Sequence, residues 1–116
     1  SNDTQGYFDD FVALMRNAWL VGQKKDYSAL LKLRQWSMDM ADSKVGREKQ
    51  KAFLQYAQRQ IRENYIYNLG NSEMNYDGNV ERMMNELSKA ETQIAQNGNA
   101  KIIFFDLCLQ MIVMVK

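Results

Sequence analysis

The segment IIFFDLCLQMIVMVK, from Ile102 to Lys116, decides the fold of this chain. Twelve of its fifteen residues are apolar, and only Asp106 and Gln110 mark a narrow polar line along the predicted helix. A helix that is apolar on nearly every side lies in the centre of a bundle, in a subunit interface or in a membrane. The run is shorter than the roughly 18–20 residues that span a bilayer, and it carries a carboxylate. We therefore predict a core or interface helix and no membrane span.

Four further segments have apolar residues at helical spacing, each mainly on one side. The helices expected from this spacing are Tyr7–Val21, Tyr27–Ala41, Arg47–Leu69 and Val80–Gln96. A loop, Gly70–Asn79, is expected between the last two of these. The chain contains no proline, so the usual helix breaker is absent from every segment. The prediction is an all-α fold: a single five-helix bundle over residues 1–116, with the C-terminal apolar helix at its centre and the other four packed against it.

The apolar stripes of the first two helices give the residues expected to face this core. In the first helix they are Phe8, Phe11, Val12, Met15, Ala18 and Trp19. In the second helix they are Tyr27, Leu30, Leu31, Leu33, Met40 and one side of Trp36.

Glycine and polar residues predict where several helices begin and end. Asp3 or Thr4 is expected to cap the first helix and Gly22 to end it, and Asp26 is expected to cap the second. Gly98 is expected just after the fourth helix, with Asn99 as the N-cap of the last. Because this turn is so short, the last two helices must be antiparallel neighbours.

Composition argues against most catalytic chemistry. A chain of 116 residues suffices for one domain with a single core, and it contains no histidine, which excludes histidine-based triads and the common zinc sites. Neither GxxxxGK[ST] nor GxGxxG occurs to hold phosphates. We expect no catalytic residue, no cofactor and no metal site, and these absences argue against a small helical enzyme. Cys108 is the single cysteine, so no internal disulfide is possible and we expect a reducing, intracellular setting. Its neighbours are both leucines, which predicts a buried thiol.

The long third helix carries a group of basic residues. They are candidates for contact with nucleic-acid backbone or an acidic partner: Arg47, Lys49, Lys51, Arg59 and Arg62. The alternative is a solvated face, because Glu48 and Glu63 are interspersed and Arg59 can pair with Glu63 at i, i+4. The net charge of +1 does not itself favour nucleic acid or membrane as a partner.

Three stretches together resemble a known domain. GREKQKAFLQYAQRQIRENYIYNL, residues 46–69, resembles the long helix in the C-terminal domain of bacterial DNA polymerase III clamp-loader delta-prime subunits. ELSKAETQIAQNGNAKIIFFDLCLQMI, residues 86–112, resembles the end of that domain, with its Gln-Asn-x-Asn-x-Lys turn and Phe-Phe-Asp-Leu helix. The opening YFDDFVALMRNAW fits its start. Between Tyr76 and Asn79 the relatives carry a longer segment. Either this chain is a short-loop variant, or residues are absent from the sequence at the abrupt Asp77-Gly78 join, as we expect.

The resemblance implies a five-helix collar domain, cut from a longer AAA+ clamp-loader subunit of the bacterial cytoplasm. Such a domain is a non-catalytic oligomerisation scaffold in the ring that loads the sliding clamp during DNA replication. Its implied partners are the C-terminal domains of the gamma/tau and delta subunits, with DNA reached only through the complex and no membrane. On the exposed ends of helices we expect interface residues at Tyr56, Tyr67, Ile103, Met111 and Met114. The rival hypothesis is a helical nucleic-acid-binding module that uses the basic residues of the long helix.

Overall fold

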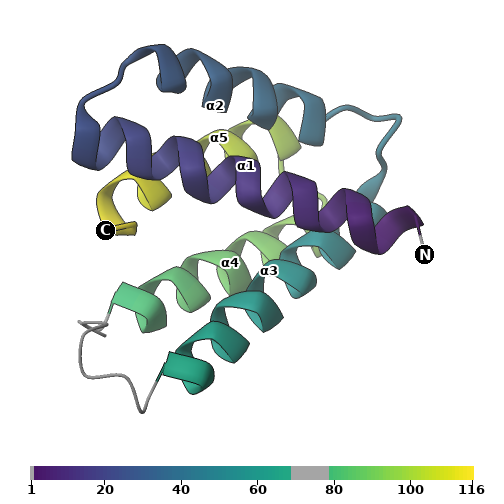
Figure 1. Ribbon diagram of the computed structural model, residues 1–116. Coiled ribbons are helices and arrows are strands. Elements are labelled where there is room, and N and C mark those ends of the chain that lie inside the picture. Colours follow the sequence, from purple (N-terminus) through teal and green to yellow (C-terminus); the bar gives the residue numbers. More distant parts are fainter. Residues whose placement is uncertain (1, 69–78) are drawn as a thin grey trace.

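All five expected helices are present in the computed structural model, which describes residues 2–68 and 79–116 and the side chains of residues 4–64 and 79–116 (Figure 1). The helices are α1 (Asn2–Lys24), α2 (Ser28–Met40), α3 (Arg47–Asn68), α4 (Asn79–Ala95) and α5 (Ala100–Met114). The described residues contain no strand, so the prediction of an all-α bundle is confirmed. The predicted loop at residues 70–78 and the join at residues 77–78 lie outside the described residues, whereas Asn79 already begins α4.

The C-terminal helix occupies the centre of the bundle, as predicted. α5 packs against α1, α2 and α4, while α3 packs mainly against α4 and also contacts α1 (Figure 1). Each helix contributes a large apolar side chain with no exposed surface to the core: Leu14, Leu33, Phe53, Leu87 and Phe104. The expectation that all four earlier helices pack mainly against the last one is therefore wrong for α3, which packs mainly on α4 and places Phe53 against rings of α1 and α2.

Trp36 connects four of the helices. From α2, its ring lies 5.6 Å from the ring of Phe53 on α3 and 6.1 Å from that of Phe104 on α5. Its indole nitrogen donates a hydrogen bond of 3.1 Å to the backbone oxygen of Asp10 on α1. A partly buried indole with this partner fixes how the end of α2 lies against α1.

The end of α1 corrects one sequence prediction. The helix continues past Gly22 to Lys24, and the left-handed residue that follows is Lys25, with a φ of 56°. A Cβ on Gly22 would lie 2.5 Å from the backbone oxygen of Ile112. This glycine therefore allows α1 to approach α5 closely, and it does not terminate the helix. The helix also begins at Asn2, so Asp3 and Thr4 lie inside it and do not cap it.

The turn between α4 and α5 follows the prediction in part. Asn99 is the N-cap of α5, and its side-chain oxygen accepts a hydrogen bond from the Ile102 N–H at 3.2 Å. The left-handed residue after α4 is Asn97 and not Gly98. The Gly98 N–H donates to the Gln93 oxygen at 2.8 Å, which closes a Schellman motif. A Cβ at Gly98 would also lie 2.8 Å from Gln93 oxygen, so this glycine is again required for close approach.

The start of α2 is stabilised by Asp26, one position earlier than a normal cap. Its carboxylate accepts hydrogen bonds from the Ser28 backbone N–H at 3.1 Å and the Ser28 hydroxyl at 2.6 Å. These two hydrogen bonds hold the pKa of Asp26 below its ordinary value. Tyr27 occupies the N-cap position without a side-chain capping bond.

Candidate association surface

The outer side of α5 exposes a continuous line of large apolar side chains. Ile102 and Val113 are 67% and 62% exposed, and Phe105 and Leu109 lie between them at 37% and 40%. Their spacing of three, four and four residues places them on one side of the helix. Because α5 packs on α1, α2 and α4, this line runs along the side of α5 that no described helix covers.

Helix α2 extends this apolar surface. Leu31 is 68% exposed and Met38 is 43% exposed, and their separation of seven residues puts them on the same side of α2. Helices α2 and α5 are neighbours, with the Cys108 sulfur 3.8 Å from the Leu33 oxygen. We name this surface the α2–α5 face, and it consists of Leu31, Met38, Ile102, Phe105, Leu109 and Val113.

A shallow groove lies on the α2–α5 face. Its volume is about 560 Å³, and its apolar lining includes Met38, Ile102 and Phe105. Arg34 and Lys101 supply positive charge at its edge, and the half-buried Asp106 supplies negative charge. A contiguous exposed apolar patch with a polar rim is typical of a protein interaction site.

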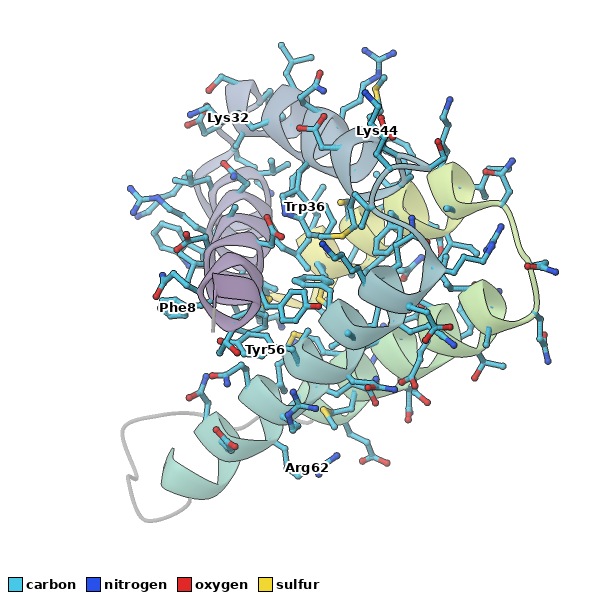
Figure 2. All side chains as sticks on the ribbon, turned by 90° about the vertical axis from the view of Figure 1, so that its right-hand side faces the viewer. Phe8, Lys32, Trp36, Lys44, Tyr56 and Arg62 are labelled. Atoms are coloured by element: carbon cyan, nitrogen blue, oxygen red, sulfur yellow. The ribbon has the colours of Figure 1, made fainter. Side chains whose placement is uncertain are left out.

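A second exposed apolar line runs along α1. Phe8, Val12 and Trp19 are 44%, 43% and 36% exposed, and their spacing places them on one side of the helix. The Lys24 ammonium lies 5.3 Å from the centre of the Trp19 ring. Figure 2 shows Phe8 pointing away from the bundle on the outer side of α1. We name this line of Phe8, Val12 and Trp19 the α1 face.

These two faces correct the expected core stripes. Phe11 and Ala18 of the first stripe are buried, as predicted, whereas the three residues of the α1 face are not. In the second stripe, Leu33 and Met40 are buried, but Tyr27 is 64% exposed and Leu31 belongs to the α2–α5 face. Apolar residues cover more of each helix than its neighbours can bury.

Four of the five expected interface residues are buried, so the prediction that they are exposed is wrong. Ile103, Met111 and Met114 lie on the inner side of α5, at 8%, 0% and 2% exposure. Tyr56 is 7% exposed, because its ring packs against those of Tyr7 at 5.9 Å and Phe11 at 6.4 Å. The side chain of the fifth residue, Tyr67, lies outside the described part of the chain.

The polar residues of α5 carried the signal that would have found the exposed side. Ile102 precedes Asp106 by four residues, and Leu109 and Val113 follow it by three and seven, so these positions share one side of the helix. Asp106 and Gln110 are both half-buried, at the border between the inner and outer sides. The narrow polar line therefore marks the edge of the solvent-facing surface.

The basic residues of α3 do not form one surface. Arg47 donates hydrogen bonds from Nη1 to the backbone oxygens of Ile94 at 3.1 Å and Gly98 at 3.0 Å. Lys51 pairs with Glu48 at 2.9 Å. The Arg47 side chain thus binds the carboxyl end of α4, where a cation is favoured, and it is a structural residue.

The remaining three basic residues are exposed in different surroundings. Lys49 lies near the start of α3 and lines a separate pocket together with residues of α1 and α2. Arg59 and Arg62 are exposed beside Glu91, and the Arg59 guanidinium lies 6.0 Å from the centre of the Tyr56 ring. The expected pair of Arg59 with Glu63 is not among the ion pairs formed by the described side chains.

Within residues 4–64 and 79–116, no three histidine, cysteine or acidic residues come together as metal ligands. Burial raises the pKa of the Cys108 thiol to about 12, so this group stays protonated and is a poor nucleophile. In the described part of the chain, no helix has the length and apolar character to cross a membrane.

Comparison of the chain with models of known protein families, with curated proteins and with solved structures finds no match.

Proposed function

We propose that this chain is a non-catalytic association domain, and specifically a collar domain of a bacterial DNA polymerase III clamp-loader subunit of the delta-prime type. The α2–α5 face is the observation that carries the association role. The sequence resemblance supplies the identity of the assembly, the loader that places the sliding clamp on DNA during replication. The proposal implies a cytoplasmic bacterial protein whose partners are the C-terminal domains of the gamma/tau and delta subunits.

The exposed apolar area explains why association is favourable. Leu31, Ile102 and Val113 are each about two-thirds exposed. Full burial of one such side chain contributes roughly 1.5–3 kcal/mol, so covering the face offsets part of the entropy lost on association. A helical protein with this surface left uncovered would be prone to non-specific aggregation.

The arrangement of two faces supports a ring. The α2–α5 face and the α1 face lie on different helices and contain different residues, and Phe8 of the α1 face points away from the bundle (Figure 2). A subunit within a ring contacts its two neighbours through two different surfaces, which is a heterologous arrangement. An isolated symmetric dimer needs only one surface, so the presence of both faces favours the ring.

Charge substitutions on the α2–α5 face test the proposal. Ile102→Glu and Leu31→Glu should abolish pull-down of the gamma/tau or delta C-terminal domain, because each places a carboxylate in an apolar contact. Thr92→Glu, at an exposed position on α4, is the matched control and should bind like the parent chain. Circular dichroism should show the same helical content for all three variants.

Two results would contradict this function. No association of the unmodified chain with any loader subunit would remove the collar role. Binding to DNA that weakens steeply with salt and is lost in Arg59→Ala and Arg62→Ala would favour the nucleic-acid-binding alternative instead.

A further inference from the structure

A second, smaller pocket lies at the end of the bundle where α1, α2 and the start of α3 meet. Its volume is about 290 Å³, near the lower limit of ligand pockets, so it suits one side-chain head group. α1 contributes Tyr7 and Asp10, and α2 contributes Trp36 and Asp39. Figure 2 shows Trp36 in the space that these helices enclose. No residue of the α2–α5 face lines this pocket.

Two aromatic rings form part of its lining. Tyr7 and Trp36 are both half-buried, and each packs against the ring of Phe53, at 6.5 Å and 5.6 Å. Contact with a buried phenylalanine holds both rings in place. Tryptophan and tyrosine faces attract cations, and they do so more strongly when the cation is partly desolvated.

Two carboxylates line the same pocket. Asp39 accepts a hydrogen bond from Gln35 at 2.8 Å. Asp10 is half-buried; its backbone oxygen accepts the Trp36 indole N–H, whereas its carboxylate forms no hydrogen bond or ion pair with the described side chains. Desolvation by burial and the neighbouring Asp9 raise the pKa of its carboxyl group.

We propose that this pocket binds the guanidinium group of an arginine side chain presented by a peptide or protein. Asp10 and Asp39 supply the negative charge, and Tyr7 and Trp36 supply the aromatic surface on which a planar cation stacks. A guanidinium suits this combination better than an ammonium, because its flat face stacks while its edge donates in a fork to a carboxylate. This inference does not depend on the proposed association of the α2–α5 face.

Lys49 places a positive charge within the pocket itself, and its removal tests the proposal. It lines the pocket from α3 and is exposed, and it forms no ion pair within 4 Å among the described side chains. Its ammonium repels an incoming guanidinium. Removing this charge should therefore strengthen binding, which a purely structural role of the pocket residues would not predict.

The test uses N-acetyl-arginine methylamide as the probe and the neutral N-acetyl-citrulline methylamide as its matched analogue. Binding is followed through the Trp36 indole N–H signal in two-dimensional NMR spectra, with Trp19→Phe used to assign that signal. The arginine compound should shift the signal in a saturable way, and the citrulline compound should bind at least about fivefold more weakly.

Four variants test which charges affect the affinity for the arginine probe. Asp10→Asn should weaken binding about threefold to fivefold, and Lys49→Gln should strengthen it about twofold to threefold. Glu81→Gln and Lys44→Gln alter exposed charges outside the pocket and should each change affinity by less than about twofold. Thermal unfolding of each variant confirms that the fold is retained.

The following outcomes would overturn the proposal. They are an unmoved Trp36 signal up to the solubility limit of the arginine probe, equal binding of the citrulline compound, and unchanged or weaker binding in Lys49→Gln. Tighter binding of N-acetyl-lysine methylamide than of the arginine probe would show that the assignment to a guanidinium is wrong.

Discussion

The inner and outer sides of α5 have nearly the same chemistry and opposite surroundings. Leu107 on the inner side is 2% exposed, whereas Leu109, two residues later, is 40% exposed. The inner side meets α1, α2 and α4, and the outer side meets no described helix. The difference teaches that apolar character alone does not assign a residue to the core. Each additional helix buries only the arc of α5 that it can reach.

A matched pair of leucine substitutions measures this contrast directly. Leu107→Ala should lower the free energy of unfolding by about 2–5 kcal/mol, because it removes buried methyl groups and leaves a cavity. Leu109→Ala should lower it by less than about 1 kcal/mol, because that side chain is partly solvated already. Urea unfolding followed by circular dichroism gives both values. Equal losses in the two variants would show that α5 is covered on both sides.

The same contrast applies to the arginines of α3. Arg47 holds the end of α4 through two hydrogen bonds from its guanidinium, while Arg62 is exposed. Arg47→Ala should cost about 2–3 kcal/mol of stability, since charged hydrogen bonds to two carbonyls are lost. Arg62→Ala should stay within about 0.5 kcal/mol of the parent chain. Chemical denaturation gives the free energy of unfolding of both variants. An equally small loss in Arg47→Ala would contradict the structural role of Arg47.

The pH dependence of stability tests whether the Cys108 thiol is buried on the inner side of α5. The folded-state pKa of about 12 lies above the ordinary value, so the folded state resists deprotonation. The stability contributed by the neutral thiol is fully present below the unfolded-state pKa of about 8.5 and is lost as pH rises toward 12. Between pH 8 and pH 10 the parent chain should lose about 1–2 kcal/mol more than Cys108→Ala. Identical pH profiles in the two chains would mean that the thiol is solvated in the native state.

The helices themselves were predictable because their apolar spacing is long and regular. The five segments and the N-cap at Asn99 follow from residue pattern alone. The end of α1 was not predictable, because a glycine that stops a helix and one that permits a close crossing look identical in sequence. Gly22 is of the second kind, and the contact that decides this is with Ile112, ninety residues away.

The exposed surface was harder to predict than the helices. Local spacing showed which residues of α1 and α2 are apolar, but it could not show how much of each stripe the neighbouring helices would cover. Phe8 and Leu31 follow the helical pattern as well as buried residues do. Arg47 likewise looked like a free cation, because its partners on α4 and in the following turn are 47 and 51 residues distant. Long-range packing decides each of these cases.

Polar substitutions on the outer side of α5 should produce the smallest change in stability. Ile102→Gln and Val113→Thr remove apolar surface that faces solvent, so each should change the free energy of unfolding by less than about 0.5 kcal/mol. The same changes should lower self-association of the isolated chain at high concentration, because they reduce the apolar patch. Denaturation and analytical ultracentrifugation on the same samples separate the two effects. A loss of stability without any change in association would mean that these side chains stabilise the fold, as the inner side of α5 does, and do not mediate association.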